Sequence, residues 1–224
     1  SVGNQYAFDP PQVLAGLAKY QALTGDLDTA KAGLGDLAKL AKGFNVDLDK
    51  MVGAAGQVGS AIGEVGEGKA FATSEEKAAA VVDVLKSLTA QGQEGAIEIS
   101  DLAVQMAKVK AAGAAFEGST ADNIKKMGAM AQLSLQLGGS ASATQAATSV
   151  MGFVSTLKTP ARRSQFKAMG VDIDSATEKG AFADPFEIIK RSLAKTEGDP
   201  EKMKKLFGNV VGERAVTALT NTYN

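Results

Sequence analysis

The stretch that comes closest to a known chemical motif is residues 63–70, GEVGEGKA. It has two glycines and a lysine at the spacing of the phosphate-binding loop, whose backbone amides and lysine cradle phosphates. Ala70 stands where that loop needs a Ser or Thr hydroxyl to hold magnesium, and Glu64 and Glu67 would place negative charge beside a phosphate. No strand-like run precedes the stretch. These mismatches favour a flexible glycine linker over a nucleotide site.

Carboxylate pairs are the second pattern that could do chemistry, because hydrolysis of a glycan needs two carboxylates facing each other across a cleft. Each available glutamate is also explained by a helix start, an exposed helix face or a helix end. The candidates are Glu75, Glu76, Glu94, Glu98, Glu187 and Glu213. We therefore predict no catalytic, cofactor-binding or metal-binding residue, and no enzyme.

The composition narrows the function classes further. The 224 residues carry 24 basic and 25 acidic side chains, so no large field is available to hold nucleic acid. The densest basic cluster, Lys202, Lys204 and Lys205, is diluted by Asp199 and Glu201, which is typical of a solvated helix face. The chain contains no Cys and no His, which removes thiolate sites and the commonest general base. Specific nucleic-acid binding is not expected.

Apolar residues recur at helical spacing along most of the chain. The clearest run is residues 100–157, in which three periodic segments are separated by the breaks Glu117-Gly118-Ser119 and Gly138-Gly139-Ser140. Glycine followed by a hydroxyl residue ends one helix and caps the next, and such short connections fold neighbouring helices back on each other. Candidate caps recur about one helix apart, at Asp26, Asp47, Ser74, Ser100, Thr120 and Ser142. The intervals are uneven, which makes only a weak case for a regular solenoid.

Two stretches depart from this pattern. Residues 53–68 hold six glycines, which indicates either a frayed helix or a mobile connector. Gly59 and Gly63 also have the spacing that lets membrane helices approach closely, although the apolar run is too short to span a bilayer. Near residues 171–183, Val171 and Ile173 alternate with Asp172 and Asp174, a pattern compatible with a small two-stranded ribbon.

We therefore predict a mainly all-α fold, an array of antiparallel helical hairpins. Two parts are expected: residues 1–72, helical hairpins with a Gly-rich connector, and residues 73–224, a larger helical domain. The start lacks an initiator Met, so we expect a segment of a longer protein. The helical patterns are short, about 15 to 25 residues or roughly 22 to 38 Å. We expect them to form a compact globule with a radius of gyration near 17 Å, by size scaling.

The chain resembles the core region of phage tail tape measure proteins, from about Asp9 to Tyr223 and most closely between Ser74 and Leu219. No single piece is specific, and the resemblance lies in their order and spacing. The pieces are the helical run at residues 100–157, the block Phe166 to Asp172, the turn Lys179-Gly180, the block Asp184 to Ile189, and Leu206-Phe207-Gly208 before Arg214-Ala215. The glycine-crowded stretch near Gly59 matches least.

The resemblance implies a structural role. Tape measure proteins lie in the tail tube lumen of the virion, set tail length during assembly in the host cytoplasm, and leave ahead of the DNA. The implied partners are tail tube and tail tip or baseplate proteins, tail assembly chaperones and further copies of the chain, with host membrane contact during ejection left open. No cofactor is implied. The alternative is a cytosolic all-helical protein–protein adaptor, which the residues themselves do not exclude.

Overall fold

The computed structural model describes residues 8–94, 97, 99–137 and 139–208. Within these residues it contains ten helices and no strand, only isolated bridges. This confirms the predicted all-α array of helical hairpins. The helices are α2 (Pro10–Thr24), α3 (Leu27–Gly43), α4 (Leu48–Ile62), α5 (Ser74–Glu94), α6 (Ile99–Gly113), α7 (Thr120–Gln136), α8 (Ala143–Lys158), α9 (Pro160–Ala168), α10 (Pro185–Thr196) and α11 (Pro200–Phe207).

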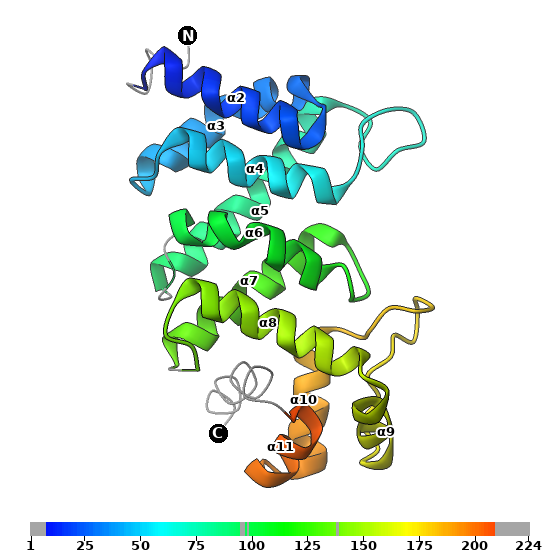
Figure 1. Ribbon diagram of the computed structural model, residues 1–224. Helices are drawn as coiled ribbons and strands as arrows, with labels where there is room; N and C mark the ends of the chain where they lie inside the picture. Colours follow the sequence, from blue (N-terminus) through cyan, green and yellow to red (C-terminus); the bar gives the residue numbers. More distant parts are fainter. Residues whose placement is uncertain (1–7, 95–96, 98, 138, 209–224) are drawn as a thin grey trace.

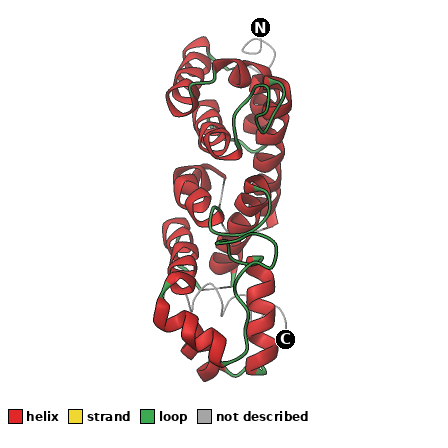
Figure 2. Ribbon diagram, turned by 90° about the vertical axis from the view of Figure 1, so that its right-hand side faces the viewer, coloured by secondary structure: helices red, strands yellow, loops and turns green. Residues whose placement is uncertain are grey.

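The first seven of these helices form two layers (Figure 1). The even-numbered helices α2, α4, α6 and α8 lie side by side in one layer, and α3, α5 and α7 lie side by side in the other. Helices α9, α10 and α11 pack together beyond α8. The array is longer in the stacking direction than across it (Figure 2), so its shape is an elongated stack and not the compact globule that we expected.

Side-chain caps explain where many of the helices begin. The predicted cap at Ser142 is present, whereas the cap expected at Thr120 is supplied by its neighbour Ser119. Asp47 precedes α4 as predicted, but its side chain makes no capping bond. A side-chain oxygen at the start of a helix can accept backbone amides that have no partner within the helix, and this hydrogen bond stabilises the helix start. The side chains that accept such amides are Asp26, Thr73, Ser119, Ser142, Asp184 and Asp199, and Thr73 thus takes the role expected of Ser74 at the start of α5.

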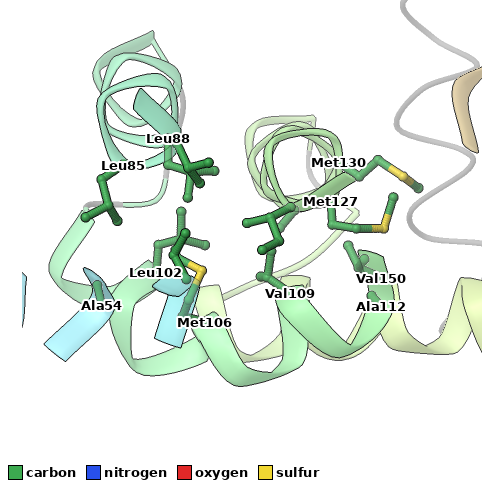
Figure 3. Close-up of a cluster of buried hydrophobic side chains, with 14 of the residues drawn as sticks. Ala54, Leu85, Leu88, Leu102, Met106, Val109, Ala112, Met127, Met130 and Val150 are labelled. Carbon is green, nitrogen blue, oxygen red and sulfur yellow. The ribbon is translucent and has the colours of Figure 1, made fainter. Parts of the chain in front are cut away.

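The core lies between the two layers (Figure 3). Leucines of α5 and methionines of α7 face α6, and all of them are buried. The labelled members are Ala54, Leu85, Leu88, Leu102, Met106, Val109, Ala112, Met127, Met130 and Val150. One hydrophobic cluster continues from α3 and α4 into α5 and α6, so buried contacts cross residue 72. The division into two domains there stays a prediction.

The glycine-rich stretch has two different parts. Gly53, Gly56 and Gly59 lie within the regular helix α4, which packs on α2. A Cβ atom added at Gly56 would lie 2.8 Å from Leu23 Cδ1, so the lack of a side chain lets the two helices approach closely. Residues 53–62 are thus neither frayed nor a connector, and only residues 63–73 connect α4 to α5.

Five buried phenylalanines tie the C-terminal segments to the stack. Successive ring centroids in this chain lie 6.0, 6.1, 5.9 and 5.2 Å apart, within the range of favourable aromatic pairs. In their order of contact, the rings are Phe182 in the loop before α10, Phe116 in the loop after α6, Phe153 in α8, Phe207 at the end of α11 and Phe166 in α9.

The small ribbon suggested for residues 171–183 is not formed as two strands. Asp174 and Phe182 make only an isolated antiparallel bridge. The backbone of Phe182 also pairs with the loop after α6, because its amide donates to the carbonyl of Ala115 (2.9 Å) and its carbonyl accepts the amide of Glu117 (2.8 Å). The segment is thus shared between two neighbours, which prevents one longer ladder.

Candidate functional site

A hollowed surface lies around residues 170–174, which we call the strap. The strap runs between α9 and α10, with Val171 and Ile173 buried and Asp172 and Asp174 exposed. The sequence showed this alternation, and the structure explains it by burial of one side of the strap against the helices. A hollow lies on each side of the strap.

The hollow on the α9 side has a volume of about 590 Å³. It is lined by Arg163, Ser164 and Lys167 together with the strap. The Arg163 Nη2 atom donates to both carboxylate oxygens of Asp174, at 2.7 Å each, and the guanidinium lies 5.6 Å from the Phe182 ring centroid. These contacts hold Arg163 in place and neutralise its charge.

The hollow on the α10 side has a volume of about 400 Å³ and is lined by Glu117, Arg191 and Lys195, among others. Arg191 Nη1 donates to the backbone carbonyl of Asp172 at 3.1 Å, which fixes the strap to α10. Gly170 has a φ of 69°, and Lys195 Nζ lies 3.8 Å from the place that a Cβ atom of Gly170 would take. A side chain here would be strained by the positive φ, although its Cβ would be only in ordinary contact with the lysine.

Glu117 connects the strap region to the stack. Its carboxylate accepts hydrogen bonds from the hydroxyls of Ser175 and Thr177 and from the backbone amide of Asp184. The Ser175 hydroxyl, followed by that of Thr177, holds the pKa of Glu117 below its ordinary value. Asp184 in turn caps α10 and forms an ion pair with Lys126 of α7 at 2.5 Å.

The two hollows together carry four cationic and three anionic side chains, which is nearly balanced. No nucleophile with an adjacent base lies among them, and the described residues hold no group of three or more His, Cys, Asp or Glu that could bind a metal ion. The arrangement offers polar recognition and no evident bond-making chemistry. The charged side chains are Arg163, Lys167, Arg191 and Lys195, and Glu117, Asp172 and Asp174.

The phosphate-loop-like stretch follows a helix and forms a turn. Residues 63–70 lie after α4, and α5 begins only at Ser74. Lys69 Nζ lies 2.8 Å from the carboxylate of Glu64, and hydrogen bonding to that carboxylate raises the pKa of Lys69. Its charge is thus directed at its own loop, which agrees with the linker interpretation.

The carboxylates considered for hydrolysis are spread over separate helix ends. Glu76 reaches back to accept the amide of Ala72 at 2.8 Å, a capping role at the start of α5. Glu75 lies beside it on the same helix, and Glu94 lies at the end of α5. Glu187 lies in the first turn of α10, 3.6 Å from Lys190. Glu98 and Glu213 fall outside the described residues.

The basic cluster lies on α11. Its three lysines, Lys202, Lys204 and Lys205, are exposed, while Met203 and Leu206 point into the core. This is the solvated helix face that the sequence predicted. The pair Arg214-Ala215 lies outside the described residues.

In the structure, the glycine considered for close packing of membrane helices contacts a neighbouring helix of the stack. Gly59 faces Tyr20 of α2 within the stack, where close packing needs a glycine. Among the described residues, no helix combines the length and apolar character needed to cross a membrane.

Sequence reasoning did not find the strap surface as a site. Its signal was present as two basic pairs at helical i, i+4 spacing, Arg163 with Lys167 and Arg191 with Lys195. Nothing in the spacing says that the two helices flank one segment. Compared with known proteins, the chain matches no family, no curated protein and no solved structure.

Proposed function

We propose that this chain is a structural component of the tail of a long-tailed phage or a related tail-like particle. In this proposal it is the core region of a tape measure protein, which sets tail length during assembly and is released ahead of the DNA at ejection. The support is the ordered set of sequence blocks that resemble that family, together with a packing arrangement in which these blocks meet.

One observation carries the proposal from sequence to structure. The blocks are far apart in the chain, yet aromatic residues from three of them are in contact. Phe166 of the first block lies 5.2 Å from Phe207 of the last, and Phe207 lies 5.9 Å from Phe153 in the helical run. Between them, Arg162 donates to the carbonyls of Lys205 (2.5 Å) and Gly208 (3.2 Å) at the end of α11. Blocks that build one packed unit are expected to occur in a fixed order.

The proposed partners follow from the proposed role. They are tail tube and tail tip or baseplate proteins, tail assembly chaperones and further copies of the chain, with contact to the host membrane at ejection left open. The proposed location is the tail tube lumen of the virion, and the host cytoplasm during assembly. A purely structural role requires no catalytic residue and no cofactor.

The genes beside the coding sequence test the proposal most directly. We expect a tail tube gene and small tail assembly chaperone genes just upstream. We also expect peptides of this chain in tryptic digests of purified particles, and their loss from particles that have ejected their DNA. Absence of tail genes from the neighbourhood, or of the peptides from intact particles, would refute the role.

The two-layered stack supports a second candidate, an adaptor that binds other proteins. Stacked helical hairpins present extended faces for binding, and the two hollows beside the strap add polar groups to one of them. An adaptor is expected in a complex in cell extracts without any particle. Co-sedimentation of the chain with intact particles, and its absence from smaller complexes, would exclude this candidate.

A further inference from the structure

The three helices beyond α8 form a unit with limited contact to the stack. Helix α11 packs on both α9 and α10, so residues 160–208 hold together, and we call them the cap (Figure 1). Among the described helices, α8 and α9 are the one pair with substantial contact between the stack and the cap. The remaining attachment of the cap must therefore come from loops and single side chains.

The loop after α6, residues 115–118, makes much of this attachment. It pairs with the backbone of Phe182 on both sides, as described above. The amide of Gly118 also donates to the carboxylate of Glu178 at 2.9 Å. This second bond is exposed, so water can replace it when the two segments separate.

The Glu117 carboxylate adds three hydrogen bonds at the same place. Its Oε2 atom accepts the hydroxyls of Ser175 and Thr177, the latter at 3.1 Å, and its Oε1 atom accepts the amide of Asp184 at 3.2 Å. Hydrogen bonds to an ionised acceptor are about twice as strong as neutral ones. One side chain of the stack thus holds three points of the cap.

A single residue joins the two parts along the chain. Thr159 ends α8 and precedes α9, and its backbone is extended, with φ of −73° and ψ of 122°. Pro160 follows it as the first residue of α9. Because proline has no amide proton, the helical hydrogen bonds of α8 cannot continue into α9. Rotation at Thr159 can therefore move the cap without breaking either helix.

We propose that the cap opens from the stack as one unit about Thr159, and that the Glu117 carboxylate holds it closed. The open state is a minor conformation whose population depends on the bonds across the boundary. The side-chain bonds of Glu117 join residues on opposite sides of that boundary. Their loss therefore favours the open state without weakening either part.

The phenylalanine chain shows which apolar contacts change on opening. Two of its pairs cross the boundary, Phe116 with Phe182 and Phe153 with Phe207. The pair of Phe166 and Phe207 lies within the cap. Opening separates the first two pairs and keeps the third, so the cap retains an aromatic core of its own.

Thiol labelling tests the opening at a point away from Glu117, because the chain contains no cysteine of its own. Thr156 of α8 is 5% exposed, and its hydroxyl lies 3.4 Å from the carbonyl oxygen of Phe207 across the boundary. Glu117→Gln should raise the labelling rate of Thr156→Cys by about 10- to 100-fold, because it weakens charge-assisted bonds. Ser149→Cys is the matched control, since Ser149 is buried in the same helix but contacts Ser140 of the stack. Its labelling rate should not change.

Hydrogen exchange tests whether the cap moves as a unit. The amide of Phe182 is bonded across the boundary to the carbonyl of Ala115, and it should exchange faster in Glu117→Gln by about the same factor. The amide of Ile188 is bonded at 2.9 Å to the carbonyl at the start of its own helix, so its rate should not change. Glu67→Gln removes an exposed charge from the loop after α4 and should alter neither rate.

A variant on the cap side repeats the test. The double substitution Ser175→Ala, Thr177→Val removes two donors to Glu117 and should change both measurements in the same direction. An unchanged labelling rate at position 156 would overturn the proposal, because loosening confined to the loop leaves α11 in place. Equal acceleration of Phe182 and Ile188 would also overturn it, because the cap would then unfold and not open. None of these results depends on the proposed tail function.

Discussion

The close contact between Gly59 and Tyr20 makes a double substitution informative. The Tyr20 side chain is 1% exposed, and its hydroxyl has no hydrogen-bond partner. A Cβ atom at Gly59 would overlap that hydroxyl and lie 3.1 Å from Tyr20 Cζ. The hydroxyl is thus both buried without compensation and the main obstacle to a larger residue in α4.

The expected free energies follow from these contacts. Gly59→Ala gains about 1 kcal/mol from helix propensity but loses about 1–3 kcal/mol through overpacking against the hydroxyl. Tyr20→Phe removes a buried polar group without a partner, so we expect unchanged or higher stability, by up to about 1 kcal/mol. In the Tyr20→Phe background Gly59→Ala should become neutral or stabilising, a coupling of about 1–3 kcal/mol.

Urea unfolding of the four proteins, followed by circular dichroism, measures this coupling. Gly35→Ala serves as the control, because nothing lies within 4 Å of a Cβ atom at that helical glycine. It should be stabilised by up to about 1 kcal/mol in both backgrounds. If Gly59→Ala changes stability equally with and without the tyrosine hydroxyl, the packing of α2 on α4 is described wrongly.

Three further predictions concern other parts of the stack. Burial, followed by the charge of Asp26, raises the pKa of Tyr20 above its ordinary 10.0. The unfolded chain therefore loses the tyrosine proton first, so the free energy of unfolding should be unchanged below about pH 10 and should fall as the pH rises above it. Alkaline urea titrations should show a smaller fall for Tyr20→Phe. Phe207→Ala should cost about 3–5 kcal/mol because it leaves a cavity in the phenylalanine chain, whereas Leu14→Ala, at an exposed position, should change urea stability by less than about 0.5 kcal/mol. Lys77, 4% exposed, lies 3.2 Å from the Asp26 carboxylate; burial opposes the charge of Asp26, but hydrogen bonds from Thr29 and Lys77 outweigh it and lower its pKa. Lys77→Met should therefore lower the free energy of unfolding by about 1–3 kcal/mol at pH 7. This difference from wild type should shrink as the pH falls below about 4, through the lowered pKa of Asp26. An equal loss at pH 7 and pH 3 would contradict the ion pair.

Local signals in the sequence were sufficient to predict where most of the described helices lie. Periodicity placed the three helices within residues 100–157, and a hydroxyl cap at Ser142 marked the start of α8, because capping and apolar spacing act within a few residues. The cap at Ser119 was displaced by one residue, since Ser119 and Thr120 both offer a hydroxyl. Helix positions and caps depend on neighbouring residues, so they can be predicted directly from the sequence.

Long-range contacts account for what the sequence left open. The glycines of α4 suggested weakness when read as helix residues alone, whereas their role depends on Tyr20 and Leu23 of another helix. In the same way, the strap hollows need α9 and α10 to be placed on either side of residues 170–174. Tertiary contact converts a locally unfavourable residue into a necessary one, and spacing cannot report it.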